Sequence, residues 1–474
     1  MKQVFFFLAM LFLCVASVRA GDEINISARN QQTVGVTIYN NNLALVKDRR
    51  KIDVPIGMQT LAFSEVSAKI KPETALMNGG DLAVLEQNFE YDLLTPQSLL
   101  QKYVGREVTM IRRHPTTGEE QPVQAKVLSV GNGVVLRVGD RIETDVNGRL
   151  VYPDVPNTLR DRPTLTMQVE SRKEGVRDVE LSYLTGGLSW QADYVAELNA
   201  ADDRLNLSGW VTLTNESGAR YPQAQLQLVA GDVNIIQKEM VSRALRKDAM
   251  AVAMAPAPQP MAEESMFEYH LYTLGRPTDI GENQKKQVAL LQAAGVECRK
   301  EFVLKGQEHY YSSQVGEIGR RMKVGVFVEL KNDKKSGLGL PLPGGIVRVY
   351  KKDGSGYLQF VGEDKVDHTP ENEVIRLHLG DAFDITADKR QSDFKKIAGF
   401  GPLHYIFESE YEVILKNAKK EQVTVNIQEP FPGDWEILSE SGGHTKESAH
   451  TVSWKVTVPP LETEKLTYRV RVKY

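Results

Sequence analysis

Alternation of apolar and polar residues constrains the fold of this chain more than any other feature. The alternation recurs along most of the sequence, for example in residues 164–169, 423–427 and 468–474. A period of two places one face of a strand on a core and the other face in water. Turn residues such as Asn147-Gly148 separate these runs. The chain is therefore expected to be mostly β and multi-domain, with immunoglobulin-like β-sandwiches.

The first twenty residues predict a secretory signal peptide. Lys2 precedes an apolar run from Val4 to Val18 that is too short to span a bilayer well. The small residue Ala20 then precedes the polar stretch that begins at Gly21, so we expect cleavage between these two residues. An uncleaved membrane anchor is the alternative. After cleavage we expect no transmembrane segment and a periplasmic or secreted location.

The cysteine content excludes an internal disulfide. Cys14 follows three bulky residues in the apolar run, which does not fit a lipid-attachment signal, so we interpret it as part of the signal peptide. Cys298 is then the one cysteine left in the sequence, and the fold must be held by core burial. No histidine lies near Cys298 in the sequence, which favours an ordinary, partly buried thiol over a nucleophile.

The charge balance argues against a nucleic-acid partner. The chain has 58 basic and 62 acidic side chains. Lys2 and Arg19 belong to the signal peptide, which has no acidic residue, so the mature chain carries a net charge of about −6. A mildly acidic chain offers no broad basic surface for nucleic acid or anionic lipid.

One short pattern, Val-x-Leu-x-Asn, occurs three times and ends at Asn215, Asn332 and Asn417. Each copy is followed by a polar turn and another expected strand. An asparagine at a strand end can bond its own backbone and thereby turn the chain. We interpret the copies as strand–turn–strand units of immunoglobulin-like sheets, with chance recurrence of a common hairpin composition as the alternative. Their unequal spacing argues against a solenoid.

The expected organisation follows from these strands and from changes in composition. Residues 101–156 have four short strands joined by Gly-rich turns, which predicts a small β-barrel of a kind that often binds ligands. Trp435 and Trp454 are expected in the last sandwich core. The domains are a signal peptide (1–20), an N-terminal β domain (21–100), the small barrel (101–156), a central β domain (157–370) and a C-terminal immunoglobulin-like sandwich (371–474).

Two segments depart from the strand pattern. Thr95 is expected to cap a short helix that begins at Pro96, buries Leu99, Leu100 and Tyr103, and ends at Gly105. Residues 240–266 are rich in methionine, alanine and proline without a period, which predicts a flexible insertion. The insertion is either a tolerated surface segment or a partner-binding one, since methionines adapt to varied surfaces.

No catalytic, cofactor or metal signature stands out in the sequence, so we expect no cofactor and favour a protein that is not an enzyme. No Gly-x-Ser-x-Gly elbow is present, and Ser355 lies between two glycines in an expected hairpin turn. No two histidines have the spacing of a zinc protease helix. The histidines are His114, His270, His309, His368, His378, His404, His444 and His450.

Residues 362–370 form the most polar cluster, with Glu363, Asp364, Asp367 and His368. These side chains could bind a divalent cation or act as acid and base, but they lack the ordered spacing of a calcium loop, and Lys365 lies among them. We interpret the cluster as a solvated loop between sheets. The rival interpretation is a polysaccharide hydrolase that uses Glu363, Asp364 and Asp367, because glycoside hydrolysis needs only two suitably spaced carboxylates.

Exposed aromatic side chains on a sandwich would favour a carbohydrate-binding module. The candidates are the pair Tyr310-Tyr311, and Tyr350 together with Tyr357. The alternative is that all four are ordinary strand residues.

Several segments together resemble the bacterial family of domain of unknown function 4139, whose relatives include mucoidy-inhibitor-A-like proteins. The resemblance covers about residues 34–474. It implies an exported, β-rich protein of a Gram-negative-type envelope and no activity that transfers residue by residue. The segments are Gly-Leu-Ser-Trp-Gln-Ala-Asp-Tyr (187–194), Gly-Trp-Val-Thr-Leu-Thr-Asn (209–215), Leu-Pro-Gly-Gly-Ile-Val-Arg-Val-Tyr (342–350), Gly-Glu-Asp (362–364), His-Thr-Pro (368–370) and Ala-Phe-Asp (382–384).

These observations predict an exported cell-envelope protein with a non-catalytic binding or structural role. The expected partner is an envelope protein or a glycan. An envelope polysaccharide hydrolase and a carbohydrate-binding module are the alternatives.

Overall fold

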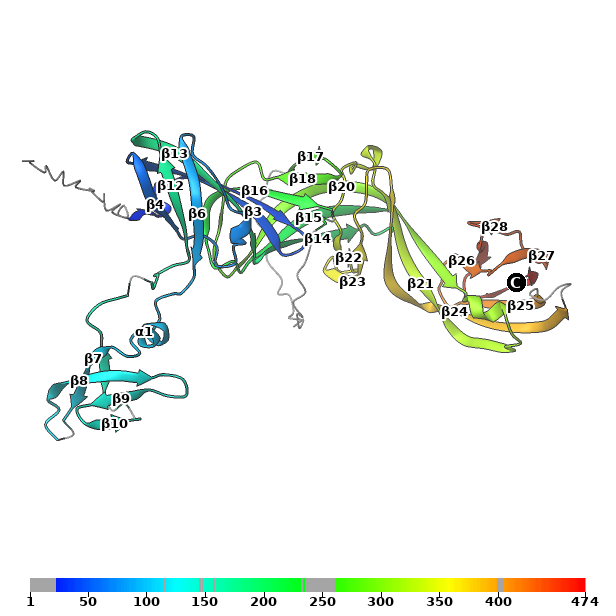
Figure 1. The fold of residues 1–474 in the computed structure, drawn as a ribbon. Coiled ribbons are helices and arrows are strands. Elements are labelled where there is room, and N and C mark those ends of the chain that lie inside the picture. Colours follow the sequence, from blue (N-terminus) through cyan, green and yellow to red (C-terminus); the bar gives the residue numbers. More distant parts are fainter. Residues whose placement is uncertain are drawn as a thin grey trace, which may run out of the picture. The chain divides into compact units, whose positions relative to one another are not determined.

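The structure, a computed structural model, consists almost entirely of strands (Figure 1). The mostly-β fold predicted from the sequence is therefore confirmed. The chain divides into two compact units, the first with residues 1–189, 214–227 and 276–284 and the second with 190–213, 228–275 and 285–474. The predicted domain boundaries stay a prediction. The structure describes residues 23–114, 116–144, 146, 148–156, 158–231, 233–234, 261–398 and 405–473.

The first unit contains two larger sheets, with strand orders β1-β4-β12-β6 and β16-β2-β3-β13-β5, and β19 beside β16. A buried ion pair links them: Arg50 on β3 lies 2.7 Å from Asp48 Oδ2 and donates to the backbone oxygens of Ile26 on β1 and Ser64 on β4. The strands are β1 (Glu23–Ile26), β2 (Gln31–Tyr39), β3 (Leu43–Val54), β4 (Gly57–Ser64), β5 (Leu76–Asn78), β6 (Leu82–Glu90), β12 (Thr164–Ser171), β13 (Gly175–Gly186), β16 (Tyr221–Ala230) and β19 (Thr278–Ile280).

The small barrel predicted for residues 101–156 is instead an open sheet. Its strand order is β10-β9-β8-β7-β11, and in the described residues the end strands β10 and β11 do not pair with each other. Closure requires strands long enough to tilt and stagger around an axis, whereas β10 and β11 have three residues each. The strands are β7 (Glu107–Arg113), β8 (Glu120–Ser129), β9 (Val135–Val138), β10 (Arg141–Glu143) and β11 (Arg149–Val151).

The predicted helix is confirmed as α1 (Pro96–Lys102), which lies beside this small sheet (Figure 1). Thr95 Oγ1 accepts a hydrogen bond from the Ser98 backbone N–H, and the Ser98 hydroxyl accepts one from the Thr95 N–H. This capping box satisfies two backbone donors that a helix start leaves unpaired. Leu100 and Tyr103 then pack against the apolar face of the sheet and close its core.

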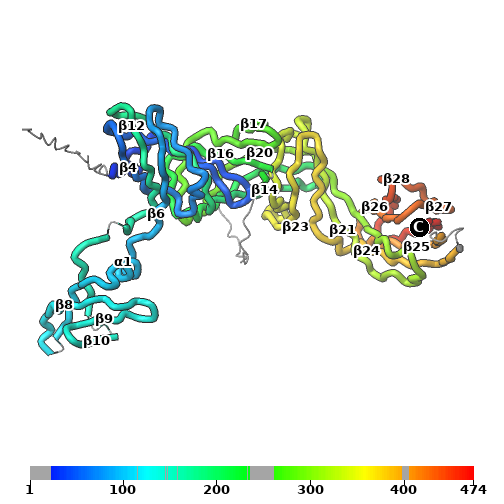
Figure 2. The backbone as a smooth tube through the Cα atoms, viewed as in Figure 1, coloured from blue at the N-terminus to red at the C-terminus, as the bar shows by residue number. Residues whose placement is uncertain are grey.

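Three long strands organise the second unit: β20 (Gln284–Lys305), β21 (Glu317–Lys331) and β24 (Val374–Ala398). Figure 2 shows β21 and β24 side by side, as their antiparallel pairing requires. The remaining strands of this unit are β14 (Leu188–Leu198), β15 (Arg204–Asn215), β17 (Ala262–Met266), β18 (Tyr269–Thr273), β22 (Gly345–Lys352), β23 (Leu358–Val366), β25 (Tyr405–Asn417), β26 (Val423–Pro430), β27 (Asp434–Glu440), β28 (Thr445–Lys446), β29 (Thr451–Val458) and β30 (Thr463–Lys473).

The C-terminal part of the second unit is a two-layer sandwich. One layer has the order β21-β24-β25-β30-β27, and the other is built from β20, β26, β29 and β28. Trp454 is buried between the layers and Trp435 packs against the same core, which confirms the predicted position of both. The alternating final strand points Tyr468 and Val470 into this core.

The three asparagines of the repeated pattern are all buried at strand ends, which confirms their predicted role in turning the chain. Asn417 Nδ2 donates to the backbone oxygens of Glu421 (2.9 Å), Val458 (3.2 Å) and Pro459 (2.9 Å), and its Oδ1 accepts from the Lys419 N–H. Each amide therefore satisfies backbone oxygens both close after its strand and in a second segment that is distant in the sequence. The corresponding acceptors are Ala219 and Gly281 for Asn215, and Leu340, Thr369 and Pro370 for Asn332.

Replacing Asn417 by alanine should lower the free energy of unfolding of the C-terminal sandwich by about 2–4 kcal/mol, because three backbone carbonyls, at buried and partly buried positions, lose their donor. Urea unfolding followed by tryptophan fluorescence measures this loss. Asn426→Ala is the matched control, since Asn426 Oδ1 has no hydrogen-bond partner. The control should change stability by less than about 0.5 kcal/mol, and equal effects of both substitutions would contradict the assigned role.

Candidate functional site

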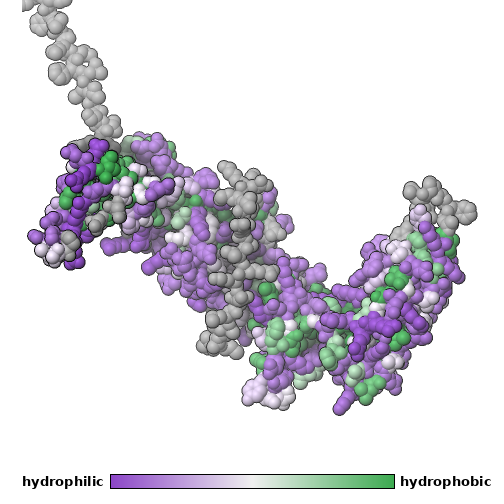
Figure 3. All heavy atoms as spheres, turned by 90° about the horizontal axis from the view of Figure 1, so that it is seen from below, coloured by the Kyte–Doolittle hydropathy of each residue, from purple (hydrophilic) through white to green (hydrophobic). Residues whose placement is uncertain are grey.

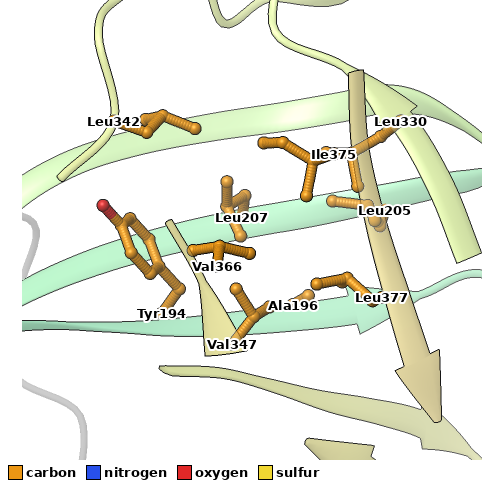
Figure 4. Close-up of a pocket in the computed structure, with 10 residues that line it drawn as sticks. All are labelled: Tyr194, Ala196, Leu205, Leu207, Leu330, Leu342, Val347, Val366, Ile375 and Leu377. Carbon is orange, nitrogen blue, oxygen red and sulfur yellow. The ribbon is translucent and has the colours of Figure 1, made fainter. Parts of the chain in front are cut away.

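One part of the second unit is a curled sheet with the strand order β23-β22-β14-β15-β20-β21-β24. Its inner face surrounds a small apolar cavity (Figure 4). The hydroxyl of Tyr194 donates to the Pro343 backbone oxygen at 2.8 Å, and burial raises its pKa well above the usual value. The lining residues are Tyr194, Ala196, Leu205, Leu207, Leu330, Leu342, Val347, Val366, Ile375 and Leu377.

A row of hydrogen-bonded side chains crosses the outer face of this sheet, with one residue from each of five adjacent strands. Gln287 Nε2 on β20 lies 3.1 Å from Thr212 Oγ1 on β15, and this hydroxyl donates to Asp193 Oδ2 on β14 at 2.7 Å. Arg348 on β22 places Nη1 3.0 Å from Asp193 Oδ1 and Nε 3.2 Å from Glu363 Oε2 on β23. We call these five residues the Asp193 row.

The Asp193 row runs from a buried carboxylate to solvent-accessible charges. Asp193 is only 7% exposed, and each of its two carboxylate oxygens accepts a hydrogen bond from a neighbouring strand. A paired, desolvated carboxylate of this kind fixes the position of its guanidinium partner. Arg348 is thereby held beside Glu363, whose side chain is half exposed.

Apolar side chains continue this outer face beyond Arg348. Tyr350 pairs with Phe360 across β22 and β23, and their ring centroids lie 5.7 Å apart in an edge-to-face arrangement. Phe360 is 54% exposed, Tyr357 is 71% exposed, and Leu358 beside them is also exposed. We call Tyr350, Tyr357, Leu358 and Phe360 the hairpin patch. Figure 3 shows, on one side of the molecule, separate hydrophobic patches within a mostly hydrophilic surface.

The turn between β22 and β23 is fixed by Asp353. Its Oδ1 accepts the N–H groups of Ser355 and Tyr357 at 2.9 and 3.0 Å, and its Oδ2 accepts from Gln359 Nε2 at 2.9 Å. The bond from Gln359 and those from the backbone lower the pKa of Asp353 below its usual value. Ser355 therefore belongs to a hairpin turn, as predicted, and the hairpin patch is ordered by bonds within the chain itself.

A second polar cluster lies in the core of the C-terminal sandwich. Lys389 Nζ on β24 lies 2.6 Å from Glu429 Oε1 on β26, and both side chains are at most 1% exposed. The Tyr311 hydroxyl donates to Glu429 Oε2 at 2.5 Å and lies 2.9 Å from the Tyr468 hydroxyl. Burial lowers the pKa of Lys389 and raises the pKa of both tyrosines well above the usual value.

The interpretation of residues 362–370 as a loop is wrong for its first half, because residues up to Val366 belong to strand β23. Glu363 and Asp364 are neighbours on this strand and therefore point to opposite faces. Asp364 Oδ2 accepts the His378 backbone N–H at 2.7 Å, on the side away from the Asp193 row. The structure thus does not bring these two carboxylates together, while Asp367 lies exposed beyond the strand end.

The aromatic candidates separate into buried and exposed residues. Tyr310 and Tyr311 lie in the short 3-10 helix η3 (Glu308–Tyr311) and are buried, so their prediction as a sugar platform is wrong. They point inward because Tyr311 bonds Glu429 in the sandwich core. Tyr350 packs on Phe360, and only Tyr357 of the second pair is strongly exposed.

Cys298 is partly buried, as predicted. Its burial, reinforced by the carboxylates of Asp203 and Asp202, raises the pKa of the thiol to about 11. The thiol is therefore almost fully protonated near neutral pH, which is unfavourable for a nucleophile.

Neither a metal site nor a membrane-spanning helix occurs in the described residues, and several residues named in the sequence analysis lie outside them. Within the ranges described above, no three His, Cys, Asp or Glu side chains gather in a way that could hold a metal ion. The same part of the chain has no helix long and apolar enough to cross a membrane. Ala20, Gly21, Cys14 and His404 lie outside the described residues, as do residues 240–260 of the predicted insertion, whose end forms β17.

Sequence reasoning singled out neither polar cluster. Asp193 and Arg348 do fall in segments that carry the family resemblance, and each is a charged residue between apolar neighbours in a strand. Glu429 stands at the next of the alternate, inward-facing positions of β26, and this position was a weak signal for a buried charge. Nothing in the sequence pairs Glu429 with Lys389, because their contact depends on how two layers meet.

The buried tyrosines predict alkaline unfolding. Their folded-state pKa values lie above the ordinary value near 10, so the folded state keeps protons that the unfolded state loses above about pH 10. Stability is therefore complete below that pH and declines as the pH rises further. The midpoint temperature of thermal unfolding should decrease as the pH rises above about 10. Tyrosinate absorbance should appear together with unfolding. Gradual ionisation of the tyrosines while the chain stays folded would contradict this prediction. The tyrosines are Tyr183, Tyr194, Tyr221, Tyr272, Tyr311 and Tyr468.

A single family model covers the Asp193 row, the hairpin patch and the C-terminal sandwich. Residues 179–474, more than half of the chain, match the family described as "Domain of unknown function (DUF4139)". A search of the curated proteins finds no match. The link to mucoidy-inhibitor-A-like proteins stays a prediction. The match confirms the resemblance found in the sequence, and the chain belongs to the DUF4139 family.

Proposed function

We propose that this chain is an exported cell-envelope protein that binds an envelope protein partner through the hairpin patch and the Asp193 row, without catalysing a reaction. The observation that carries the proposal is the hairpin patch. Aromatic and aliphatic side chains stand exposed there on a hairpin that is already ordered. Contiguous exposed apolar surface of this kind marks interaction sites, because leaving it in water is unfavourable.

The composition of the surface favours a protein partner over a glycan. Tyrosine, phenylalanine and arginine are enriched in protein interfaces, and Tyr350, Phe360 and Arg348 lie together on one face. Leu358 is also exposed there and adds aliphatic surface, which suits a protein better than a sugar ring. Because the hairpin is ordered in advance, binding costs little further ordering.

A non-catalytic role is supported by how the charges of the Asp193 row are used. Asp193 is held by two neighbouring strands, and Glu363 is paired with Arg348. Carboxylates engaged in this way hold neighbouring side chains in position.

Export is supported by the first twenty residues. Lys2, the apolar run and Ala20 before Gly21 fit a cleaved signal peptide. The envelope location is supported further by the resemblance of the chain to exported envelope proteins.

The first test of the proposal is the mature N-terminus. Protein purified from cells that express the full chain should begin at Gly21, as read by terminal peptide mass spectrometry. It should also appear in the periplasmic or extracellular fraction, because the signal peptide directs export. A chain that keeps Met1 and stays in the cytoplasm would contradict the proposal.

The second test is site-specific crosslinking. A photoreactive residue in place of Tyr357 should capture one envelope protein in near-stoichiometric amount. The same residue in place of Leu461, which is 69% exposed on the turn before β30, should not capture it. The double substitution Leu358→Ser and Phe360→Ser should reduce capture at least tenfold, since hot-spot aromatic residues carry about 2 kcal/mol or more.

Capture from both positions, or from neither, would contradict the proposed surface. Recovery of a glycan instead of a protein from the Tyr357 position would show that the partner is a glycan and would favour a carbohydrate-binding module. Circular dichroism of the double variant should match the unsubstituted protein, because both replaced side chains lie on the surface.

A further inference from the structure

The buried Lys389 and Glu429 side chains place an amine against a carboxyl group with nothing between them. Nζ and Oε1 are 2.6 Å apart, and the two side chains are 1% and 0% exposed. Lys389 belongs to the β24 layer of the C-terminal sandwich and Glu429 to the β26 layer, so the contact spans the two layers.

Aromatic rings enclose this pair on several sides. The Lys389 Nζ lies 4.7–6.0 Å from the ring centroids of four tyrosines. The Phe431 ring packs edge-to-face on one of them, with centroids 4.7 Å apart. Such an enclosure keeps bulk water away from the Lys389 amine and the Glu429 carboxyl group. The four tyrosines are Tyr310, Tyr311, Tyr411 and Tyr468.

The chain is also shaped around the Glu429 carboxyl group. A Cβ atom at Gly306 would lie 1.9 Å from Glu429 Oε2, so only glycine leaves room for this group. The Gly306 N–H donates to the Gln428 backbone oxygen at 2.7 Å, which holds the two segments together. The carboxyl group is thus confined between Gly306, Lys389 and Tyr311.

Burial favours the uncharged form of the Lys389 amine. Desolvation lowers the pKa of Lys389, which makes the nucleophilic free amine more accessible. The Tyr311 hydroxyl, 2.5 Å from Glu429 Oε2, is placed to donate a proton to the carboxyl oxygen that would leave. Two buried charges cost solvation free energy, whereas an amide between the same side chains carries no charge.

We propose that Lys389 and Glu429 condense to a side-chain amide that covalently joins the two layers of the sandwich. The neutral Nζ attacks Glu429 Cδ, an N–C bond forms, and the C–Oε2 bond breaks. Oε2 leaves as water with two protons, one from the amine and one from the carboxylic acid, and Tyr311 relays the second and regains the proton that it gives. An amine and a carboxylic acid thus give an amide and one water molecule, with no oxidant or other reactant.

The linkage would supply a covalent brace that this chain cannot obtain from cysteine. Cys298 is the one cysteine outside the predicted signal peptide, so no internal disulfide is available to the exported form. A crosslink between residues 389 and 429 closes a long loop, which reduces the freedom of the unfolded chain. The inference is independent of the partner-binding surface and can hold whether or not that proposal does.

Intact-mass spectrometry of the purified full-length product tests the amide directly. The mass should be lower, by one water molecule, than the sequence from the observed N-terminus requires. Tryptic digestion should yield one branched peptide that contains both residues, and trypsin should not cleave after Lys389. The Asp48–Arg50 pair is an internal control, since it is equally buried but its guanidinium is a poor nucleophile, and its peptides should be unmodified.

Two variants separate the chemistry from simple packing. Lys389→Arg keeps the positive charge without the amine nucleophile, and its mass should show no loss of water. Tyr311→Phe keeps both reacting groups but lacks the proposed proton donor, so a smaller fraction of its chains should show the loss. An unsubstituted protein with the full expected mass, and with free Lys389 and Glu429 peptides, would overturn the proposal and leave an ordinary buried ion pair.

Discussion

Hydrogen bonding of backbone groups at buried strand ends is the constraint on which the rest of this structure depends. Strands that end within a core expose carbonyls that the sheet no longer satisfies, and each unsatisfied group is costly. Asn215, Asn332 and Asn417 solve the problem in the same way, with a side-chain amide that donates both to a carbonyl close after it in the sequence and to one or two carbonyls of a distant segment. Each amide thereby ties the end of its strand to a segment that is distant in the sequence.

Local features of the sequence were sufficient to predict local features of the structure. The capping residue Thr95, the strand-end asparagines and the inward position of Trp454 follow from properties of neighbouring residues, and all three are confirmed. The prediction of a small barrel was wrong because closure of a sheet depends on strand length and stagger, which short apolar runs do not reveal. The prediction of a sugar platform at Tyr310 and Tyr311 was wrong because the direction of these side chains depends on Glu429, which is more than a hundred residues away in the sequence.

The charged residues of the strands form two kinds of polar site, one buried from solvent and one that reaches the surface. The pairs Asp48–Arg50 and Lys389–Glu429 are fully enclosed, so their role is confined to holding layers together. The pair Asp193–Arg348 differs, since Arg348 extends from a buried carboxylate to a half-exposed Glu363 beside the hairpin patch. A rigid polar row next to exposed aromatic side chains is the arrangement from which we infer a binding surface.

Hydroxyl-radical footprinting of the chain in isolated envelopes and in purified form would test this surface most directly. Tyr357, Leu358 and Phe360 should be labelled in the purified protein and protected in envelopes, whereas Leu461 should be labelled equally in both. Equal labelling of the hairpin patch in the two preparations would contradict the claim that a partner covers it.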